Sequence, residues 1–110
     1  MNLKSEKLRC AILGSGNIGT DLLIKAMRSE LLECVLFIGQ NEQSPGLARA
    51  RNLGIRTSHQ KIKAILDDPD CCDLVFDATS AGDHKSHWAV LECLGKTVID
   101  MTPSKVGKWI

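Results

Sequence analysis

Short apolar runs alternate with longer segments of helical periodicity along this chain. The apolar runs, which we expect to be strands, cover residues 8–13, 33–38, 55–57, 73–77 and 97–100. Between them, apolar residues recur at helical spacing, and we expect helices over residues 17–29, 45–53, 59–66 and 83–94. Regular alternation of strand and helix is typical of a parallel sheet with helices on both faces.

The periodicity also indicates which helix faces turn toward the sheet. We expect inward side chains at Ile18, Leu22, Leu23, Ala26 and Met27 on the first helix, Ile62, Ile65 and Leu66 on the third, and Trp88, Leu91 and Leu94 on the fourth. Ser44-Pro45 is typical of a helix start, whereas Gly54 and Gly95 are typical of helix ends.

A glycine-rich turn joins the first strand to the first helix. Gly14, Gly16 and Gly19 form the pattern G-x-G-x-x-G between an apolar run and a helical pattern. We expect Gly14 to permit a tight turn, Gly16 to let the backbone approach a diphosphate, and Gly19 to let helix and strand pack closely. The unpaired amides of the first helical turn then face the phosphates. A turn that serves packing alone would use the same glycines, so the flanking elements carry this prediction of dinucleotide binding.

The glycine turn also predicts the strand order. With right-handed crossovers, the five strands form a Rossmann-type doubly wound sheet in the order 3-2-1-4-5. The order reverses between strands one and four, so the loops of residues 14–19 and 78–82 meet beyond the strand ends. The second loop is Ala78-Thr79-Ser80-Ala81-Gly82, whose small residues suit a flat ring and its ribose. The same segment also suits an ordinary turn with Ser80 or Asp83 as helix cap.

Composition narrows the class of protein. The chain has 110 residues, of which 44% are hydrophobic, and a formal net charge of +1. This suits one domain with a core, and the balanced charge gives no support to nucleic-acid or membrane binding. The sequence has no apolar run of the roughly 18 residues that would span a membrane, and its N-terminus does not look like a signal peptide. We therefore expect a cytoplasmic protein.

The cysteines do not predict a metal or dithiol site. They are Cys10, Cys34, Cys71, Cys72 and Cys93, and none forms a C-x-x-C pair. Cys10 and Cys34 fall in apolar runs, where we expect small buried side chains. Reduced thiols suit a cytoplasmic protein, although adjacent Cys71 and Cys72 leave a vicinal disulfide as an alternative.

Other polar residues near the predicted edge have plain structural roles. His84 and His87 stand three positions apart, a spacing that a metal pair can use, but no third ligand is in register. We expect both to be surface or helix-capping residues. Asp77 ends the fourth strand, and we expect it to cap or brace the loop that follows.

Four blocks of the sequence resemble one family. They are GSGNIGTDLLIK, QSPGLARARNLGI, DLVFDATSAGDH and VIDMTPSKVG, and they look like the N-terminal half of acylating acetaldehyde dehydrogenase over about residues 8–107. The resemblance implies an NAD-dependent oxidoreductase that converts acetaldehyde, CoA and NAD to acetyl-CoA and NADH, and that partners an aldolase in aromatic catabolism. It also implies cofactor contacts from Ser15, Gly16, Asn17 and Ile18, and a nicotinamide side lined by Thr79, Ser80, Ala81 and Gly82.

One departure from the family concerns catalysis. In the family, the thiol that attacks the aldehyde lies beyond the matched region, and none of the five cysteines here stands at its position. We therefore expect residues 1–101 to form a dinucleotide-binding domain and residues 102–110 to form a linker or frayed tail. This domain should show no turnover without a catalytic domain. The alternative is a stand-alone nucleotide- or CoA-binding module that regulates or tethers a partner. The open sheet edge at strand five also favours self-association.

A second departure concerns the adenosine ribose, which an acidic residue after the second strand usually binds. The family has an aspartate there, and Asn41 aligns with it in this chain. Asparagine can still bind a hydroxyl, but it does not repel a 2′-phosphate, and Glu42 is an alternative acceptor. Arg49 and Arg51 could reach that phosphate, or they could simply be solvated. We expect NAD in preference to NADP.

Overall fold

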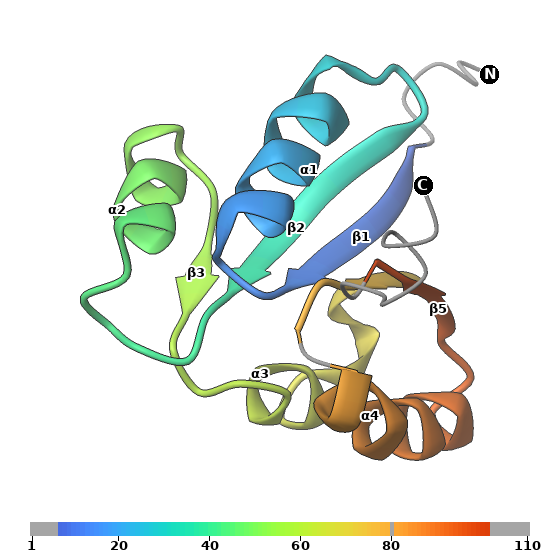
Figure 1. The fold of residues 1–110 in the computed structure, drawn as a ribbon. Helices are drawn as coiled ribbons and strands as arrows, with labels where there is room; N and C mark the ends of the chain where they lie inside the picture. The colour runs from blue at the N-terminus through green and yellow to red at the C-terminus, as the bar shows by residue number, and fades with distance from the viewer. Residues whose placement is uncertain (1–6, 80, 102–110) are drawn as a thin grey trace, which may run out of the picture.

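The strands and helices occur in the predicted order. In a computed structural model that describes residues 7–79 and 81–101, five parallel strands form one sheet in the order β3-β2-β1-β4-β5 (Figure 1). The strands are β1 (Leu8–Leu13), β2 (Leu32–Ile38), β3 (Thr57–Ser58), β4 (Leu74–Asp77) and β5 (Thr97–Asp100). The helices are α1 (Asn17–Arg28), α2 (Pro45–Asn52), α3 (Lys63–Leu66) and α4 (Ala81–Cys93), with a 3₁₀ turn, η2 (Pro69–Cys71), before β4. The predicted Rossmann-type fold is confirmed.

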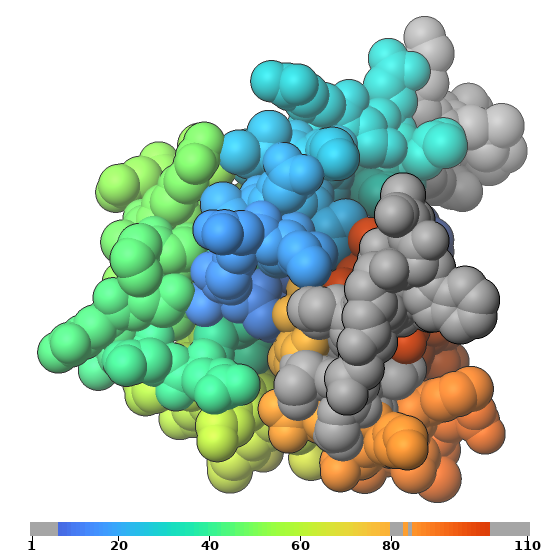
Figure 2. Space-filling model, in the orientation of Figure 1, coloured from blue at the N-terminus to red at the C-terminus, as the bar shows by residue number. Residues whose placement is uncertain are grey.

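Helices cover both faces of the sheet. α1 and α2 lie on one face, and α3 and α4 lie on the other (Figure 1). In the space-filling view, the surface of α1, in blue, adjoins that of α2, in green (Figure 2). Strands covered on both sides are almost wholly apolar, which explains why β1 and β2 appear in the sequence as hydrophobic runs.

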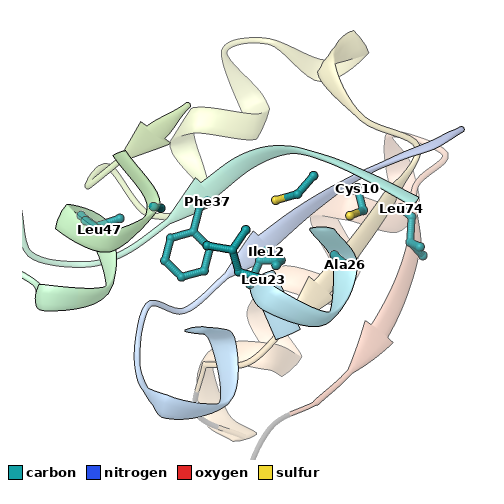
Figure 3. Close-up of a cluster of buried hydrophobic side chains, with 9 residues drawn as sticks. Cys10, Ile12, Leu23, Ala26, Phe37, Leu47 and Leu74 are labelled. Carbon is teal, nitrogen blue, oxygen red and sulfur yellow. The ribbon is translucent and has the colours of Figure 1, made fainter. Parts of the chain in front are cut away.

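Two apolar clusters fill the space between the sheet and its helices. The first core lies under α1 and α2, and its buried members are Cys10, Ile12, Leu23, Ala26, Cys34, Phe37, Leu47, Ala50 and Leu74 (Figure 3). The second core lies under α3 and α4, and its buried members are Ala11, Leu13, Leu36, Ile38, Ala64, Ile65, Cys72, Val75 and Leu91. Burial of each large aliphatic or aromatic side chain contributes about 1.5–3 kcal/mol. The central strands are therefore anchored from both sides.

A bulge in β2 decides which of its side chains reach which core. Cys10 pairs with Cys34, but the next residue of β1, Ala11, pairs with Leu36, so Val35 is an extra residue in β2. Because of this insertion, Cys34 and Phe37 face the same core although three positions separate them. A simple alternation of faces would have placed them on opposite sides.

The inward faces of α1 and α4 differ from the prediction. On α1 the buried residues are Gly19, Leu23 and Ala26, while Ile18 and Met27 are 39% and 44% exposed. The contact begins at Gly19, where the absence of a side chain permits close approach to Gly14 and Ile12. On α4 Leu91 is buried as predicted, but Trp88 and Leu94 are 53% and 39% exposed.

The segment before β4 departs most from the prediction. β3 occupies Thr57–Ser58 rather than residues 55–57, and α3 is only Lys63–Leu66 rather than residues 59–66. Lys61 has a φ of +58°, a left-handed conformation that cannot be part of a right-handed helix. Leu66, expected to face inward, is 41% exposed.

All five cysteines are free thiols, so Cys71 and Cys72 form no disulfide. Cys10 and Cys34 are buried in the first core, as predicted. Burial raises the pKa of the Cys72 thiol to about 12, so this group is uncharged at neutral pH. Cys93 is exposed at the end of α4.

Candidate functional site

The carboxyl ends of the five parallel strands form one edge of the sheet. After β1, β2, β4 and β5, the first residue beyond the strand donates its amide to the neighbouring strand or its extension: Gly14 to the Ile38 carbonyl at 2.7 Å, Gly39 to Ser58 at 2.8 Å, Ala78 to Leu13 at 2.7 Å, and Met101 to Asp77 at 2.8 Å. These bonds extend the ladder by one residue and fix the start of each loop to the sheet. The predicted switch point between β1 and β4 lies on this edge.

The turn after β1 depends on two close backbone contacts. Gly14 has a φ of +111°, and a Cβ on it would lie 2.7 Å from the carbonyl oxygen of Ala78. A Cβ on Gly19 would lie only 1.8 Å from the carbonyl oxygen of Gly14. The geometry of both glycines matches the turn and packing roles that the sequence predicts for them.

The β2–α2 loop is fastened to this turn around Ser15. The hydroxyl oxygens of Ser15 and Ser44 lie 2.8 Å apart and share a hydrogen bond. A Cβ on Gly46 would lie 2.1 Å from the carbonyl oxygen of Ser15, and one on Gly39 would lie 2.5 Å from the Ser15 hydroxyl. Two glycines and a hydroxyl therefore let the β2–α2 loop lie directly against the turn after β1.

The start of α1 leaves its first backbone amides open. The N-cap, Gly16, has no side chain to accept from them, and the first helical bond runs from the Thr20 amide to the Gly16 carbonyl at 2.9 Å. The amides before Thr20 therefore have no carbonyl partner within the helix. A Cβ on Gly16 would meet nothing within 4 Å, so the space in front of these amides is unobstructed. Such a helix start attracts anions through its amides and its dipole.

A cleft of about 1150 Å³ lies over this helix start. Of the predicted cofactor-binding residues, its wall contains Gly14, Ser15, Gly16, Asn17, Ile18, Asn41 and Thr79. Gly19 is buried behind the turn. Ser80 lies outside the described residues, and Ala81 and Gly82 form the first turn of α4. The cleft thus extends from the glycine turn to Asn41, the residue predicted to bind the ribose, and to the start of the loop after β4.

The cleft wall also contains residues that were not predicted to belong to the site. They include Gln40, Ser44, Gly46 and Met101. Gly46, in the first turn of α2, is a signal that the sequence does contain, because a glycine inside a helix often marks close approach of another backbone. Ser44 gave no such signal, since its partner Ser15 is 29 residues away in the chain.

The side chain of Asn41 is engaged within its own loop. Its Oδ1 accepts the amide of Gln43 at 2.9 Å, which leaves the side-chain NH₂ group to donate to a ligand. Arg49 lines the cleft, whereas Arg51 donates its Nε to the Thr57 hydroxyl at 3.1 Å. Of the two arginines considered for a 2′-phosphate, Arg49 is therefore the one at the cleft.

A buried carboxylate supports the loop after β4. Asp77 is 0% exposed, and its Oδ1 accepts from the amide of Thr79 at 3.0 Å and from the Thr79 hydroxyl at 2.5 Å. Its Oδ2 lies 3.0 Å from Nδ1 of His87 on α4. The prediction that Asp77 braces this loop is confirmed. The prediction that His87 is a surface or capping residue is wrong, because its side chain is 14% exposed and contacts Asp77. The side chain of His84 lies outside the described part of the chain.

A smaller cavity of about 300 Å³ lies at the same edge of the sheet. It shares Gly14, Gln40 and Thr79 with the cleft, so the two spaces adjoin. Residues before α3 and on α4 complete its wall and give it charged and titratable groups, namely Lys61, Asp83 and His87.

Two features that would point to other functions are absent from residues 7–79 and 81–101. No helix there is long and apolar enough to cross a membrane. No three His, Cys, Asp or Glu side chains in this part gather as metal ligands would.

Solved structures share this fold. GenD2 from gentamicin A biosynthesis, in complex with NAD, has a TM-score of 0.76 at 23% identity, with coverage of 86% of this chain and 26% of that chain. Myo-inositol 2-dehydrogenase from Lactobacillus plantarum has a TM-score of 0.74 at 22% identity, with coverage of 86% and 28%. Biliverdin reductase from Synechocystis, solved with biliverdin and NADP+, has a TM-score of 0.73 at 26% identity, with coverage of 84% and 28%. The fold and the glycine turn define a Rossmann-fold domain of the kind found in dehydrogenases.

Sequence relatives narrow this class. Acetaldehyde dehydrogenase of Pectobacterium atrosepticum is 62% identical over 103 residues, which are 94% of this chain and 35% of that protein. Acetaldehyde dehydrogenase of Spirochaeta aurantia is 53% identical over 106 residues, 96% of this chain and 36% of that protein. This chain is a homologue of the acetaldehyde dehydrogenases, and it spans about a third of the length of these relatives. A scan of family models gives no match.

Proposed function

We propose that this chain is the NAD-binding domain of an acylating acetaldehyde dehydrogenase. The homology supports this function over 94% of the chain in the Pectobacterium relative. The observation that carries the proposal is the unobstructed space before the first turn of α1, where a Cβ on Gly16 would meet nothing within 4 Å. In the complete enzyme, acetaldehyde, CoA and NAD would give acetyl-CoA and NADH.

The diphosphate of the cofactor would lie against the first turn of α1. Backbone amides of Asn17 and Ile18 would donate to its oxygens, with Ser15 beside them, and the absent side chain of Gly16 would leave room for the phosphates. Gly14 and Gly19 would act by holding the turn in shape. A helix start of this kind favours a nearby anion by about 0.3–1 kcal/mol at an exposed surface.

The nicotinamide half would lie toward the loop after β4. Thr79, which Asp77 holds in place, would line this side together with Ser80, Ala81 and Gly82. Bound NAD supplies the acceptor for a hydride. The contribution of this chain would be to bind and orient the ring.

The chemistry on the aldehyde would need a thiol from outside this chain. Cys10 and Cys34 are buried in the first core, and Cys71 and Cys72 precede β4 at the opposite edge of the sheet from the cleft. Cys93 lies at the last turn of α4. We therefore expect the 110 residues to bind a dinucleotide and to show no turnover without a catalytic domain. In the complete system, an aldolase would be the partner of the enzyme.

The binding test compares Gly16→Val with the native chain by calorimetry. We expect NAD to bind the native chain in the micromolar to millimolar range, on the order of 4–8 kcal/mol, because part of the binding wall would belong to the catalytic domain. Gly16 has φ −77° and ψ −160°, which valine can adopt, so the variant should fold. Its affinity for NAD should fall at least about tenfold, because its side chain would occupy the phosphate space.

Ala48→Val, at an exposed position on α2, is the matched control and should bind like the native chain. Equal affinity in Gly16→Val and Ala48→Val would overturn the assigned diphosphate position. Binding of CoA without binding of NAD would instead favour the stand-alone CoA module.

The preference for NAD over NADP can be tested at Asn41. An aspartate there would accept the ribose hydroxyls and repel a 2′-phosphate, so Asn41→Asp should raise the ratio of NAD to NADP affinity about fivefold, or ~1 kcal/mol. This ratio is obtained by measuring the affinities for NADH and NADPH from the fluorescence of these reduced forms. An unchanged ratio would mean that Asn41 does not read the ribose.

A further inference from the structure

The hydrogen-bond network around Asp77 includes His87, a residue that dinucleotide binding by the glycine turn does not explain. The Asp77 carboxylate is completely buried and contacts two elements, with Oδ1 bonded to Thr79 and Oδ2 bonded to His87. Thr79 belongs to the loop at the cleft, whereas His87 belongs to the second turn of α4. The imidazole and the loop are therefore linked through a single carboxylate.

The position of Thr79 matters to both spaces at the sheet edge. Thr79 lines the cleft of about 1150 Å³ and the adjoining cavity of about 300 Å³. Two hydrogen bonds to one carboxylate oxygen fix its amide and its hydroxyl, at 3.0 and 2.5 Å. If the carboxylate rotated, both bonds would be lost together. The bond from His87 to the other oxygen, at 3.0 Å, opposes that rotation.

We propose that His87 is a positioning residue for the nucleotide cleft, which holds the loop after β4 in its binding conformation by fixing the carboxylate of Asp77. This inference rests on the proposed dinucleotide binding. His87 acts through Asp77 and Thr79, so its effect reaches the nucleotide through the loop.

The surroundings of His87 suit this role. Nδ1–H of His87 donates to Asp77 Oδ2 at 3.0 Å, because a carboxylate accepts. Asp83, one turn earlier on α4, and Lys61, from the segment before α3, line the adjoining cavity together with His87.

Two substitutions of His87 test the hydrogen bond to Asp77. The NH₂ group of asparagine can stand where Nδ1–H stood, so His87→Asn keeps the donor. His87→Leu removes it. At pH 8 we expect His87→Asn to bind NADH within about twofold of the native chain and His87→Leu to bind it about tenfold more weakly. His59→Leu, at an exposed position, is the matched control and should bind normally.

Rescue by His87→Asn is the readout that a general loss of packing would not give, because the affinity for NADH should return with the donor although the imidazole is absent. The inference is overturned if His87→Leu binds NADH like His59→Leu, or if His87→Asn binds it as weakly as His87→Leu.

Misfolding of a variant and failure of the proposed function can both be told apart from failure of this inference. If His87→Leu does not fold by circular dichroism, His87→Met serves as the second variant without a donor and should also bind NADH about tenfold more weakly. If the native chain binds no dinucleotide at all, the proposed function fails. If the native chain binds and the His87 variants are indistinguishable from it, only the positioning role fails.

Discussion

The two loops that meet at the sheet edge are held in place by opposite means. The turn after β1 is fixed by missing side chains, since a Cβ on Gly14 or Gly19 would lie 2.7 or 1.8 Å from a carbonyl oxygen. The loop after β4 is fixed by an additional side chain, the buried carboxylate of Asp77 with its bonds to Thr79 and His87. One loop is defined by steric fit and the other by hydrogen bonding.

The two loops should therefore be sensitive to different substitutions. A turn that is held by backbone packing is disturbed by an added side chain. A loop that is held by hydrogen bonds is disturbed when a donor or an acceptor is removed.

The largest expected effect comes from adding one methyl group to the glycine turn. Gly19→Ala would place a Cβ 1.8 Å from the Gly14 carbonyl oxygen, so the free energy of unfolding should fall by about 4 kcal/mol or folding should fail. Gly16→Ala is the control, because its Cβ meets no atom within 4 Å, and it should cost less than about 1 kcal/mol. Urea denaturation measures both, and equal stabilities would show that steric fit does not define this turn.

A smaller loss is expected when the carboxylate of the second loop is removed. Asp77→Ala removes the carboxylate that accepts from the amide and the hydroxyl of half-buried Thr79, and it should lower the free energy of unfolding by about 3 kcal/mol. Asp73→Ala, just before the start of β4, removes only an exposed pair with Arg9 at 3.4 Å and should cost less than about 1 kcal/mol. Equal stabilities of the two variants in thermal or urea unfolding would show that hydrogen bonding to Asp77 does not fix the loop after β4.

The smallest effect tests whether the glycine turn also uses hydrogen bonding. Ser15 and Ser44 share one hydroxyl–hydroxyl bond at 2.8 Å, which should contribute about 1 kcal/mol. A double-mutant cycle with Ser15→Ala and Ser44→Ala isolates this coupling from other effects of either change. A coupling near zero would show that steric fit alone joins the turn to the start of α2. The two loops would then differ fully in what holds them, steric fit in one and hydrogen bonding in the other.

Most of the fold could be predicted from the sequence because it depends on local periodicity. The five strands and their order followed from apolar runs, helical spacing and the handedness of crossovers. The bulge at Val35 could not be predicted, since it shows only as a shift between paired strands. The helix predicted over residues 59–66 was too long, because its apolar residues suit a helix but Lys61 adopts a left-handed conformation before α3 begins.

The candidate site could be predicted only where its residues are close in the chain. The glycines of the first turn form one motif, and their structural roles could be read from their spacing. Ser44 and His87 contribute through contacts with Ser15 and Asp77, which depend on how distant segments meet. The helical periodicity of α4 also favoured Trp88 as the inward residue, because an apolar pattern does not reveal a polar partner on the sheet.

The backbone hydrogen bonds of the sheet continue past the strand ends, and this affects how a ligand would bind. Amides of Gly14, Ala78 and Met101 lie in loops, yet each is bonded to the sheet at 2.7–2.8 Å. They should exchange with solvent deuterium as slowly as strand amides, while the first amides of α1 exchange freely. A molecule arriving at the cleft would thus meet a rigid frame around a few open donors, and little conformational entropy would be lost in receiving it.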